Sequence, residues 1–472
     1  MLESFIAVDL GAQSGRVVVG TFDDEGFSLD EAHRFANVPV IIDGTLCWDA
    51  DALFEETLVG LRNAVGLIDA RGSRPSGIAV DSWGVDYGLV DGSGDLVVPI
   101  RHYRANAHWT VDLASARVPR AEAYDRTGII ELSINTVFQL VRDNAIGLLD
   151  GHPTVLLTPD LWTFWLTGVR GAEMTIASTT GLLDRQSGGW ADDLVSRWEI
   201  PRDVLPTLVP TGASAGTTTI AVTERIGAVS PIPVFRAPAH DTASAFAAVV
   251  SPGENSGVIS CGTWALVGCC APRPVLTADA MAAGFTNEVG AEESTVLIRN
   301  LSGTWLLEEC LREWCAADGS TDTAGLRDEL LAEAAALPSA VVLIDPGDPE
   351  LIERGDMPAR IGALLRRLGG DGEPDRGVLV RLILDSLACS FATTVAAAGR
   401  LTGTDLERIH MIGGGSQIDL LVRLTEEASG LPVRVGQVEA TSIGNVCVQA
   451  VAAGIFPDLS AARAATKDGA AR

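Results

Sequence analysis

Short apolar runs separated by glycine turns open this chain. Phe5 to Asp9 predicts a buried strand and Arg16 to Phe22 a second one, and Gly11 and Gly15 bracket a tight turn between them. The helical period then appears from Asp49 to Ile68. Its predicted apolar face consists of Leu53, Phe54, Leu58, Leu61, Val65 and Ile68.

Another strand pattern follows this helix. Ile78 to Asp81 predicts a strand that is broken at Trp83-Gly84, and Val85 to Val90 runs into an Asp91-Gly92 turn. Strands mixed with helices in this way indicate an α/β fold.

Prolines mark the middle of the chain. Six of them between residues 201 and 238 indicate a loop-rich stretch, and we place the main domain boundary near residues 238 to 245. A helix is predicted from Thr242 to Val250, closed by Pro252-Gly253.

The second half begins with the same pattern as the first. Gly257 to Gly268 and Ile6 to Gly20 each read as an apolar strand, a glycine turn with hydroxyl side chains, and a second apolar strand. This similarity indicates a duplicated fold with a ligand cleft between the halves, or else two glycine hairpins that are alike by chance.

A third strand is predicted later, from Arg408 to Ile412. It ends in Gly413-Gly414-Gly415, which is either a flexible turn or a close approach of the backbone to a ligand. A helix should follow, and its predicted apolar face consists of Leu420, Leu421, Leu424 and Ala428.

Composition narrows the possible functions. The chain has 472 residues, of which 47% are hydrophobic, so two or three folded domains are expected. A net charge of −28 disfavours binding to nucleic acid or to anionic membranes. The single lysine, Lys467, excludes a Walker phosphate loop, a protein kinase and Schiff-base catalysis.

Cysteines and the N-terminus point to the cytoplasm. The eight cysteines include no Cys-x-x-Cys pair, as expected of free thiols in a reducing compartment. The chain shows no export signal and no stretch that approaches 18 apolar residues, so no membrane span is expected.

Four positions could carry chemistry. Asp9 at a strand end could hold Mg²⁺, and the turn after it could bind phosphate through amides, although such an Asp is often only a turn former. Asp241 is either a helix N-cap or a general base, and the two roles are compatible. Thr263 is a phosphate contact or a turn residue. Asn300, placed between a predicted strand from Val296 to Ile298 and a helix around Trp305, is a helix cap or a ligand contact.

One motif misleads. The residues around Ser214, Gly-Ala-Ser-Ala-Gly, match a hydrolase nucleophile elbow, but prolines precede them and a β-prone run follows. The glycine fingerprint of dinucleotide-binding proteins is absent from the sequence.

Taken together, the motifs resemble those of a known family. The motifs are, in order along the chain, AVDLGAQSGR, DSWGVD, AHDTASA, SCGTW, TNEVGAEE, IGGGSQ and EATSIGN. Together they resemble the FGGY carbohydrate kinases, and among these the rhamnulokinases most closely. The resemblance extends from about residue 4 to 450. It implies two actin/hexokinase-like (ribonuclease H-like) α/β domains, residues 1–240 and 241–455 with a tail at 456–472, and an ATP–sugar cleft between them.

The resemblance also implies an activity and its residues. The activity is transfer of phosphate from ATP, with Mg²⁺, to the 1-hydroxyl of L-rhamnulose in cytoplasmic L-rhamnose breakdown, by a monomer or small homo-oligomer. Asp241 matches the catalytic base and Asp9 the acidic residue associated with Mg²⁺. The family's sugar contacts fall on Gly84, His240, Thr242 and Asn300. Its ATP contacts fall on Ala12, Gln13, Ser14, Gly15, Arg16, Thr263, Glu308 and Gly414.

Some positions depart from the family pattern, and rival functions remain. Glu308 stands where rhamnulokinases tend to have Gln, Ile418 where the GGGxQN motif has Asn, and Gln13 where a small hydroxyl residue is usual. Another FGGY kinase, for L-fuculose, L-ribulose, D-xylulose or a polyol, would share every phosphate motif. An actin- or Hsp70-like nucleotide-binding protein would not need His240 and Asp241 together.

Overall fold

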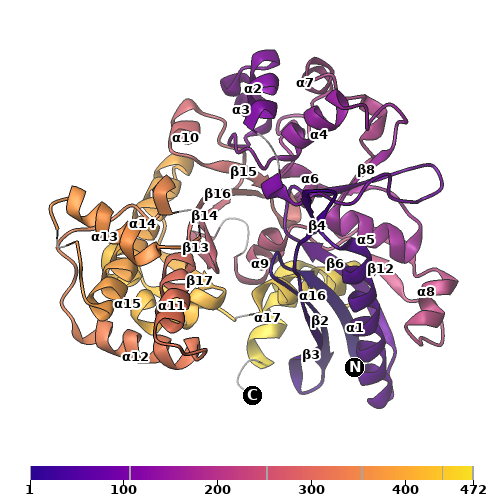
Figure 1. Ribbon diagram of the computed structural model, residues 1–472. Helices are drawn as coiled ribbons and strands as arrows, with labels where there is room; N and C mark the ends of the chain where they lie inside the picture. Colours follow the sequence, from indigo (N-terminus) through magenta and orange to yellow (C-terminus); the bar gives the residue numbers. More distant parts are fainter. Residues whose placement is uncertain are drawn as a thin grey trace. The chain divides into compact units, whose positions relative to one another are not determined.

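The computed structural model describes residues 2–105, 108–250, 254–351, 354–370, 372–437 and 439–469, with side chains up to residue 466. The chain forms two compact units (Figure 1). Unit 1 comprises Met1–Gly253, Ala271–Val296 and Glu439–Arg472, and unit 2 comprises Glu254–Cys270 and Leu297–Val438. Each unit is discontinuous in sequence, whereas the predicted domains were continuous, and the division at residue 240 stays a prediction. The predicted helix end at Pro252-Gly253 lies outside the described residues.

Unit 1 is built on a six-stranded mixed sheet. In spatial order its strands are β11 (Ser214–Thr217), β12 (Pro233–Phe235), β6 (Pro75–Ser82), β1 (Glu3–Leu10), β2 (Ser14–Asp23) and β3 (Gly26–Ala36). β1 pairs antiparallel with β2 and parallel with β6, which confirms the first predicted hairpin and its strand neighbour. Gly15, predicted to close the turn, already belongs to β2.

Different helices cover the two faces of this sheet. Ile6 and Val8 of β1 share an apolar core with helix α1 (Ala50–Ala70), so the alternate residues, Asp9 among them, face the other side. That side carries α16 (Ala440–Ala452), which packs along α9 (Asp241–Val249), as Figure 1 shows. The two helices can approach because Gly444 has no side chain, since a Cβ there would lie 1.8 Å from the Ser244 carbonyl oxygen.

Further helices and short strands complete unit 1. They are β4 (Val40–Ile42), β5 (Thr45–Cys47), β7 (Tyr87–Val90), α2 (His108–Arg117), α3 (Arg120–Thr127), α4 (Thr136–Ala145), β8 (Thr154–Leu157), α5 (Thr158–Thr167), β9 (Ala172–Glu173), α6 (Met174–Ser178), α7 (Asp192–Arg197), β10 (Leu208–Val209), α8 (Ile220–Arg225), α10 (Ala278–Ala282), β15 (Thr286–Val289) and α17 (Leu459–Gly469). The predicted C-terminal tail thus contains a helix, and buried Arg463 anchors it through the carbonyls of Ala247 and Val250.

Unit 2 repeats the hairpin arrangement. Its strands are β16 (Thr295–Ser302), β14 (Trp264–Ala271), β13 (Ser256–Cys261), β17 (Arg408–Ile412) and β18 (Val433–Val435), in this spatial order. β13 pairs antiparallel with β14 and parallel with β17, as β1 does with β2 and β6. The predicted internal repeat is therefore confirmed as two hairpins of the same design.

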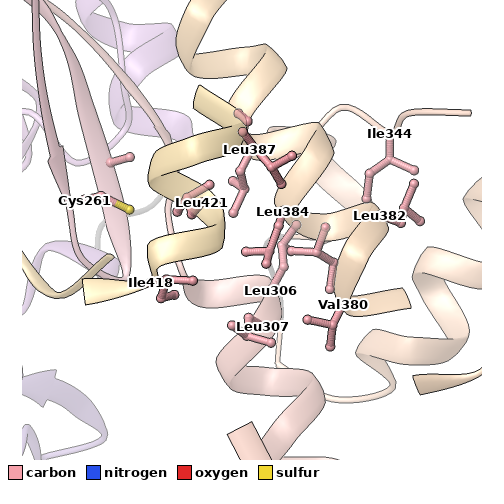
Figure 2. Close-up of a cluster of buried hydrophobic side chains, with 14 of the residues drawn as sticks. Cys261, Leu306, Leu307, Ile344, Val380, Leu382, Leu384, Leu387, Ile418 and Leu421 are labelled. Carbon is pink, nitrogen blue, oxygen red and sulfur yellow. The ribbon is translucent and has the colours of Figure 1, made fainter. Parts of the chain in front are cut away.

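The helices of unit 2 enclose a large apolar core. They are α11 (Trp305–Ala317), α12 (Thr323–Ala336), α13 (Met357–Arg367), α14 (Arg376–Thr402) and α15 (Asp419–Ser429). Figure 2 shows Leu306 of α11, Leu384 of α14 and Leu421 of α15 converging in this core. The predicted apolar face of α15 is wrong at one position, because Ala428 is exposed and Thr425 takes its place.

One helix contradicts the expectation about apolar length. α14 is long and apolar enough to cross a membrane, which the sequence analysis did not anticipate. However, 78% of its apolar window is buried inside the protein. Its Arg381 and Asp385 pair at 3.0 Å, and the arginine also bonds the Leu337 carbonyl. This burial is typical of a core helix.

Candidate active site

Three sequence motifs meet at one end of the unit 1 sheet. The parallel register places Asp9 beside Asp81 and Leu10 beside Ser82. Ser82 in turn forms a parallel bridge with His240, just before α9. The motifs AVDLG, DSWG and AHDTAS therefore come together at the carboxyl ends of neighbouring strands, where open α/β sheets bind ligands.

Asp241 begins helix α9 but does not cap it. The N-cap residue is His240, and Asp241 is the first residue of the helix. The predicted capping role is therefore wrong by one position. The Asp241 carboxylate accepts hydrogen bonds from the Thr242 amide at 2.6 Å and from the Thr242 hydroxyl at 3.2 Å. A third of this side chain is exposed, so a substrate could reach it.

The pKa of Asp241 reflects opposing influences. Burial raises it, the neighbouring His240 lowers it, and the charge of Asp9 raises it again. A raised pKa makes a carboxylate a stronger base, which suits Asp241 to accept a proton.

Buried acids hold the segment before α9 in place. The Glu173 carboxylate accepts from the Ala239 amide at 3.1 Å, and the Thr175 hydroxyl accepts from the His240 amide at 3.1 Å. Burial raises the pKa of Glu173. Asp160 accepts from the Glu173 amide and pairs with Arg236 at 2.5 Å. This network was not predicted from the sequence, although acids inside apolar runs are a signal for it.

The loop predicted to bind phosphate is a tight turn. The Gly11 amide bonds the Ser14 carbonyl at 3.0 Å, and the Asn37 side chain bonds the Gly11 carbonyl at 2.9 Å. Ala12 to Ser14 thus form an ordered turn at the end of β1, with the Gln13 side chain exposed.

Arg16 lies between two carboxylates. It is bonded to Asp9 at 2.7 Å and is also paired with Glu439 at the start of α16. Burial opposes its charge, but Asp9 and Glu439 together raise its pKa. The Ser442 hydroxyl also bonds Asp9.

The acids of this face could hold a divalent cation. Asp81 is fully buried, its Oδ1 lacks a hydrogen-bond partner, and burial and Asp9 raise its pKa. Over the described ranges, no three acidic, His or Cys side chains are grouped closely enough to form a metal cage. The donors present therefore fit an ion held by one or two carboxylates together with phosphate oxygens, which suits Mg²⁺.

The segment after β6 is unusual. Gly84 lies against Thr179, whose hydroxyl would be 3.2 Å from an added Cβ. The next residue, Val85, has a φ of 71°, which is strained for a β-branched residue. Its carbonyl is held by Thr136 at 2.8 Å.

Asp86 anchors this strained turn. It accepts from the indole nitrogens of Trp48 at 2.6 Å and Trp83 at 3.0 Å. Burial raises the pKa of Asp86 to about 6. The sequence analysis named the DSWGVD motif but gave this aspartate no role.

Unit 2 carries the other predicted residues, and two of them lie close together. Thr263 is at the tip of the β13–β14 hairpin, where its carbonyl accepts from the Gly303 amide at 3.0 Å. The glycine turn that contains Gly414 packs on the same hairpin, since a Cβ on Gly413 would lie 2.6 Å from the Cys261 carbonyl oxygen. Gly414 itself has open space around it.

The remaining two positions differ from expectation. Asn300 does not lie between a strand and a helix but within β16, where it is exposed, and the N-cap of α11 is Thr304. Both oxygens of Glu308 lie 2.7 Å from Arg327. The carboxylate that replaces the usual Gln is therefore already paired with a cation.

Ser214 is not a nucleophile elbow. It begins the short edge strand β11, and its hydroxyl accepts from the Gly216 amide. An elbow requires a preceding strand and a helix that starts at the serine.

Comparison with known proteins covers nearly the whole chain. Models of the N-terminal and C-terminal domains of the FGGY family of carbohydrate kinases match residues 4–248 and 257–453. A protein named rhamnulokinase from Bacteroides thetaiotaomicron is 36% identical over 98% of this chain and 93% of its own length. One from Pectobacterium atrosepticum is 35% identical over 98% and 90%.

Solved structures show the same fold. The ligand-bound xylulose kinase of Lactobacillus acidophilus superposes with a TM-score of 0.79 at 16% identity, covering 98% of this chain and 91% of the other. The glycerol kinase of Plasmodium falciparum with ADP gives 0.78 at 14% identity, covering 99% and 92%. The predicted actin/hexokinase-like fold is confirmed.

Proposed function

Because the chain belongs to the FGGY family of carbohydrate kinases, we propose that it transfers the γ-phosphoryl group of ATP to the 1-hydroxyl of L-rhamnulose. The observation that carries the choice of sugar is the 33–36% identity to proteins named rhamnulokinase over at least 98% of the chain. The product would be L-rhamnulose 1-phosphate, formed in L-rhamnose breakdown in the cytoplasm.

Asp241 is the proposed base. The Thr242 amide and hydroxyl both bond the same oxygen, Oδ1, and so fix the orientation of the carboxylate. The N-terminus of α9 favours its ionised form. As the sugar hydroxyl attacks the phosphorus atom, its proton passes to Asp241 and the bond to ADP breaks.

Charge on the phosphates must be neutralised without lysine. Amides of the Ala12–Gly15 turn and the Arg16 guanidinium are the proposed donors in unit 1, and Thr263 and Gly414 are the proposed nucleotide contacts in unit 2. Asp9 would hold Mg²⁺, which supplies electrostatic stabilisation of the transferring phosphoryl group when bound. Arg16 would exchange its pairing with Glu439 for phosphate oxygens.

Sugar recognition is proposed to use Gly84, His240, Thr242 and Asn300. His240 is the one of these that carries charge, and the absence of a side chain on Gly84 leaves room beside Thr179. The role of Asn300 in this recognition stays a prediction.

The test compares ADP release with MgATP and L-rhamnulose, L-fuculose, L-ribulose or D-xylulose. We expect L-rhamnulose to give the highest kcat/KM. Replacing Asp241 by Asn should lower kcat by about 10²–10⁴-fold. Asn keeps an oxygen for the Thr242 amide, so the variant should fold, which circular dichroism and the Tm check.

Asp279→Asn is the matched control. Asp279 is an exposed aspartate in the first turn of α10, and its replacement should leave kcat within about twofold. A higher kcat/KM with another ketose would leave the family assignment intact and overturn L-rhamnulose as the substrate. Full activity of Asp241→Asn would overturn the role of Asp241 as the base.

A further inference from the structure

Glu288 lies beside His240, the neighbour of the proposed base. It belongs to β15 of unit 1, within the TNEVGAEE motif. Its side chain is nine-tenths buried, which is costly for a carboxylate unless a cation lies beside it. A buried acid at this position needs an explanation.

The neighbours of Glu288 along the strand fix its direction. The Asn287 amide bonds the Gly128 carbonyl at 2.9 Å, and the Asn287 side chain accepts from the Val275 amide at 2.6 Å. On the other side, the Val289 amide bonds the Ser178 hydroxyl at 2.9 Å. Because adjacent side chains of a strand point to opposite faces, this anchoring of Asn287 aims Glu288 the other way.

Glu288 is aimed at His240. Its Oε2 lies 2.9 Å from Nδ1 of the imidazole, and the second ring nitrogen, Nε2, lies 3.5 Å from Oδ1 of Asp241. The Glu288 contact is short but lies outside good hydrogen-bond geometry, so its strength comes mainly from charge. The three side chains form a line from the strand to the start of α9.

We propose that Glu288 is a positioning residue that acts through His240, which it orients and keeps cationic beside Asp241. This role rests on the proposed function, because it assumes that Asp241 is the base. The imidazolium then keeps Asp241 ionised and holds a hydrogen-bond donor next to the sugar hydroxyl. Glu288 itself touches neither reactant.

The charges around the ring support this role. Burial alone would lower the pKa of His240, but Glu288 first, and then Asp241 and Glu173, raise it to about 9. These acids come from β15, α9 and β9, the elements that face the ring. A second cation near Glu288 is Arg185, which bonds Thr295 at 3.1 Å and approaches the Glu288 carbonyl at 3.5 Å.

The first measurement does not depend on activity. Protein labelled with ¹³C at histidine is titrated by NMR, and His240→Gln identifies the His240 signal. In the wild type the His240 ring should titrate near pH 9. In Glu288→Gln its pKa should fall by about 1–3 units, since an opposite charge at this distance is removed.

The second measurement is the pH profile of kcat/KM for the sugar. The alkaline limb of the wild type should lie near pH 9. The limb of Glu288→Gln should move to lower pH, with a loss of about threefold or more at pH 8.5. Glu293→Gln, an exposed acid of the following turn, should leave both the NMR pKa and the limb in place.

The outcomes separate this proposal from the proposed function. An unchanged His240 pKa in Glu288→Gln overturns the proposal, whatever the activity is. A shifted pKa with an unmoved kcat/KM limb also overturns it, because the charge would then have no catalytic effect. If Glu288→Gln does not fold, Glu288→Asp is used instead and should titrate between wild type and the imidazole's ordinary value. Full activity of Asp241→Asn would refute the role of Asp241 as the base, whereas the effect of Glu288 on the pKa of His240 could still be observed.

Discussion

The two glycine hairpins have the same topology and opposite chemistry. In unit 1, the register pairs Asp9 with Arg16 across the hairpin and with Asp81 on the parallel neighbour. In unit 2, Ser260 pairs with Leu266 and Ile412 in the matching positions. One hairpin therefore carries charged side chains at these positions, and the other carries uncharged ones.

The difference extends to the surrounding cores. Within the described ranges, the carboxyl groups whose pKa is raised, with burial as the largest cause, all belong to unit 1: Asp81, Asp86, Asp160, Glu173 and Asp241. The buried acids of unit 2, Glu309 and Asp385, each lie beside an arginine. Under the proposed function, proton transfer would fall to the copy that carries these acids, and the other copy would contact the nucleotide.

Removing the charge of Asp9 from the unit 1 hairpin should have the largest effect on kcat. Asp9→Asn should lower kcat by about 10²–10³-fold, because the proposed ligand of Mg²⁺ is lost and with it stabilisation of the transferring phosphoryl group. Ser260→Ala, the matching change in unit 2, should leave kcat within about twofold. Steady-state ADP release measures both, and equal losses in the two variants would contradict the comparison.

The buried acids should make unit 1 less stable as the pH rises. The pKa of Asp86 is raised from 3.8 to about 6, so its protonated form stabilises the native state below pH 3.8, and this contribution is lost as the pH rises through 6. It amounts to about 3 kcal/mol in all, of which about 1.5 kcal/mol falls between pH 5 and 8. Asp86→Asn removes this titration, so relative to wild type it should gain that amount over the same range.

Urea unfolding at pH 5 and pH 8, followed by pulsed hydrogen exchange at one fixed pH, measures the change. Asp318→Asn in unit 2 provides the contrast, because Arg376 lowers the pKa of Asp318. Its contribution is fully present above the unfolded pKa of 3.8 and is lost only as the pH falls below that value, so Asp318→Asn should show no change relative to wild type between pH 5 and pH 8. A relative gain in Asp318→Asn equal to that of Asp86→Asn over this range would refute the prediction.

Substitution of two neighbouring glycines in unit 2 should distinguish an effect of backbone strain on stability from an effect of ligand contact on KM. Gly413 has φ 80° and ψ −178°, a conformation that is nearly confined to glycine, and an added Cβ would meet the Cys261 carbonyl. Gly413→Ala should therefore lower the free energy of unfolding by about 1–3 kcal/mol. Gly414→Ala has free space and should keep its stability but raise the KM for ATP. Loss of stability in Gly414→Ala, with no change in KM, would argue against the predicted contact.

Local residue patterns predicted many of the helices and strands correctly. The first hairpin, the helix from Asp49 and the strand before Gly413 all form as expected, because apolar period and glycine turns act over a few residues. The errors lie at positions where the exact end of a helix or strand decides what a residue does. Asp241, for example, follows the N-cap residue of α9 instead of being that residue.

The sequence by itself determined the α/β class, the two matching hairpins and the motifs that identify the kinase family. Tertiary structure alone decided which side chains meet: Asp86 between two tryptophans, Arg16 between Asp9 and Glu439, and Glu288 against His240. These contacts join segments that are far apart along the chain. They depend on which strands become neighbours, and long-range packing sets that order, whereas the residue pattern within any one segment does not.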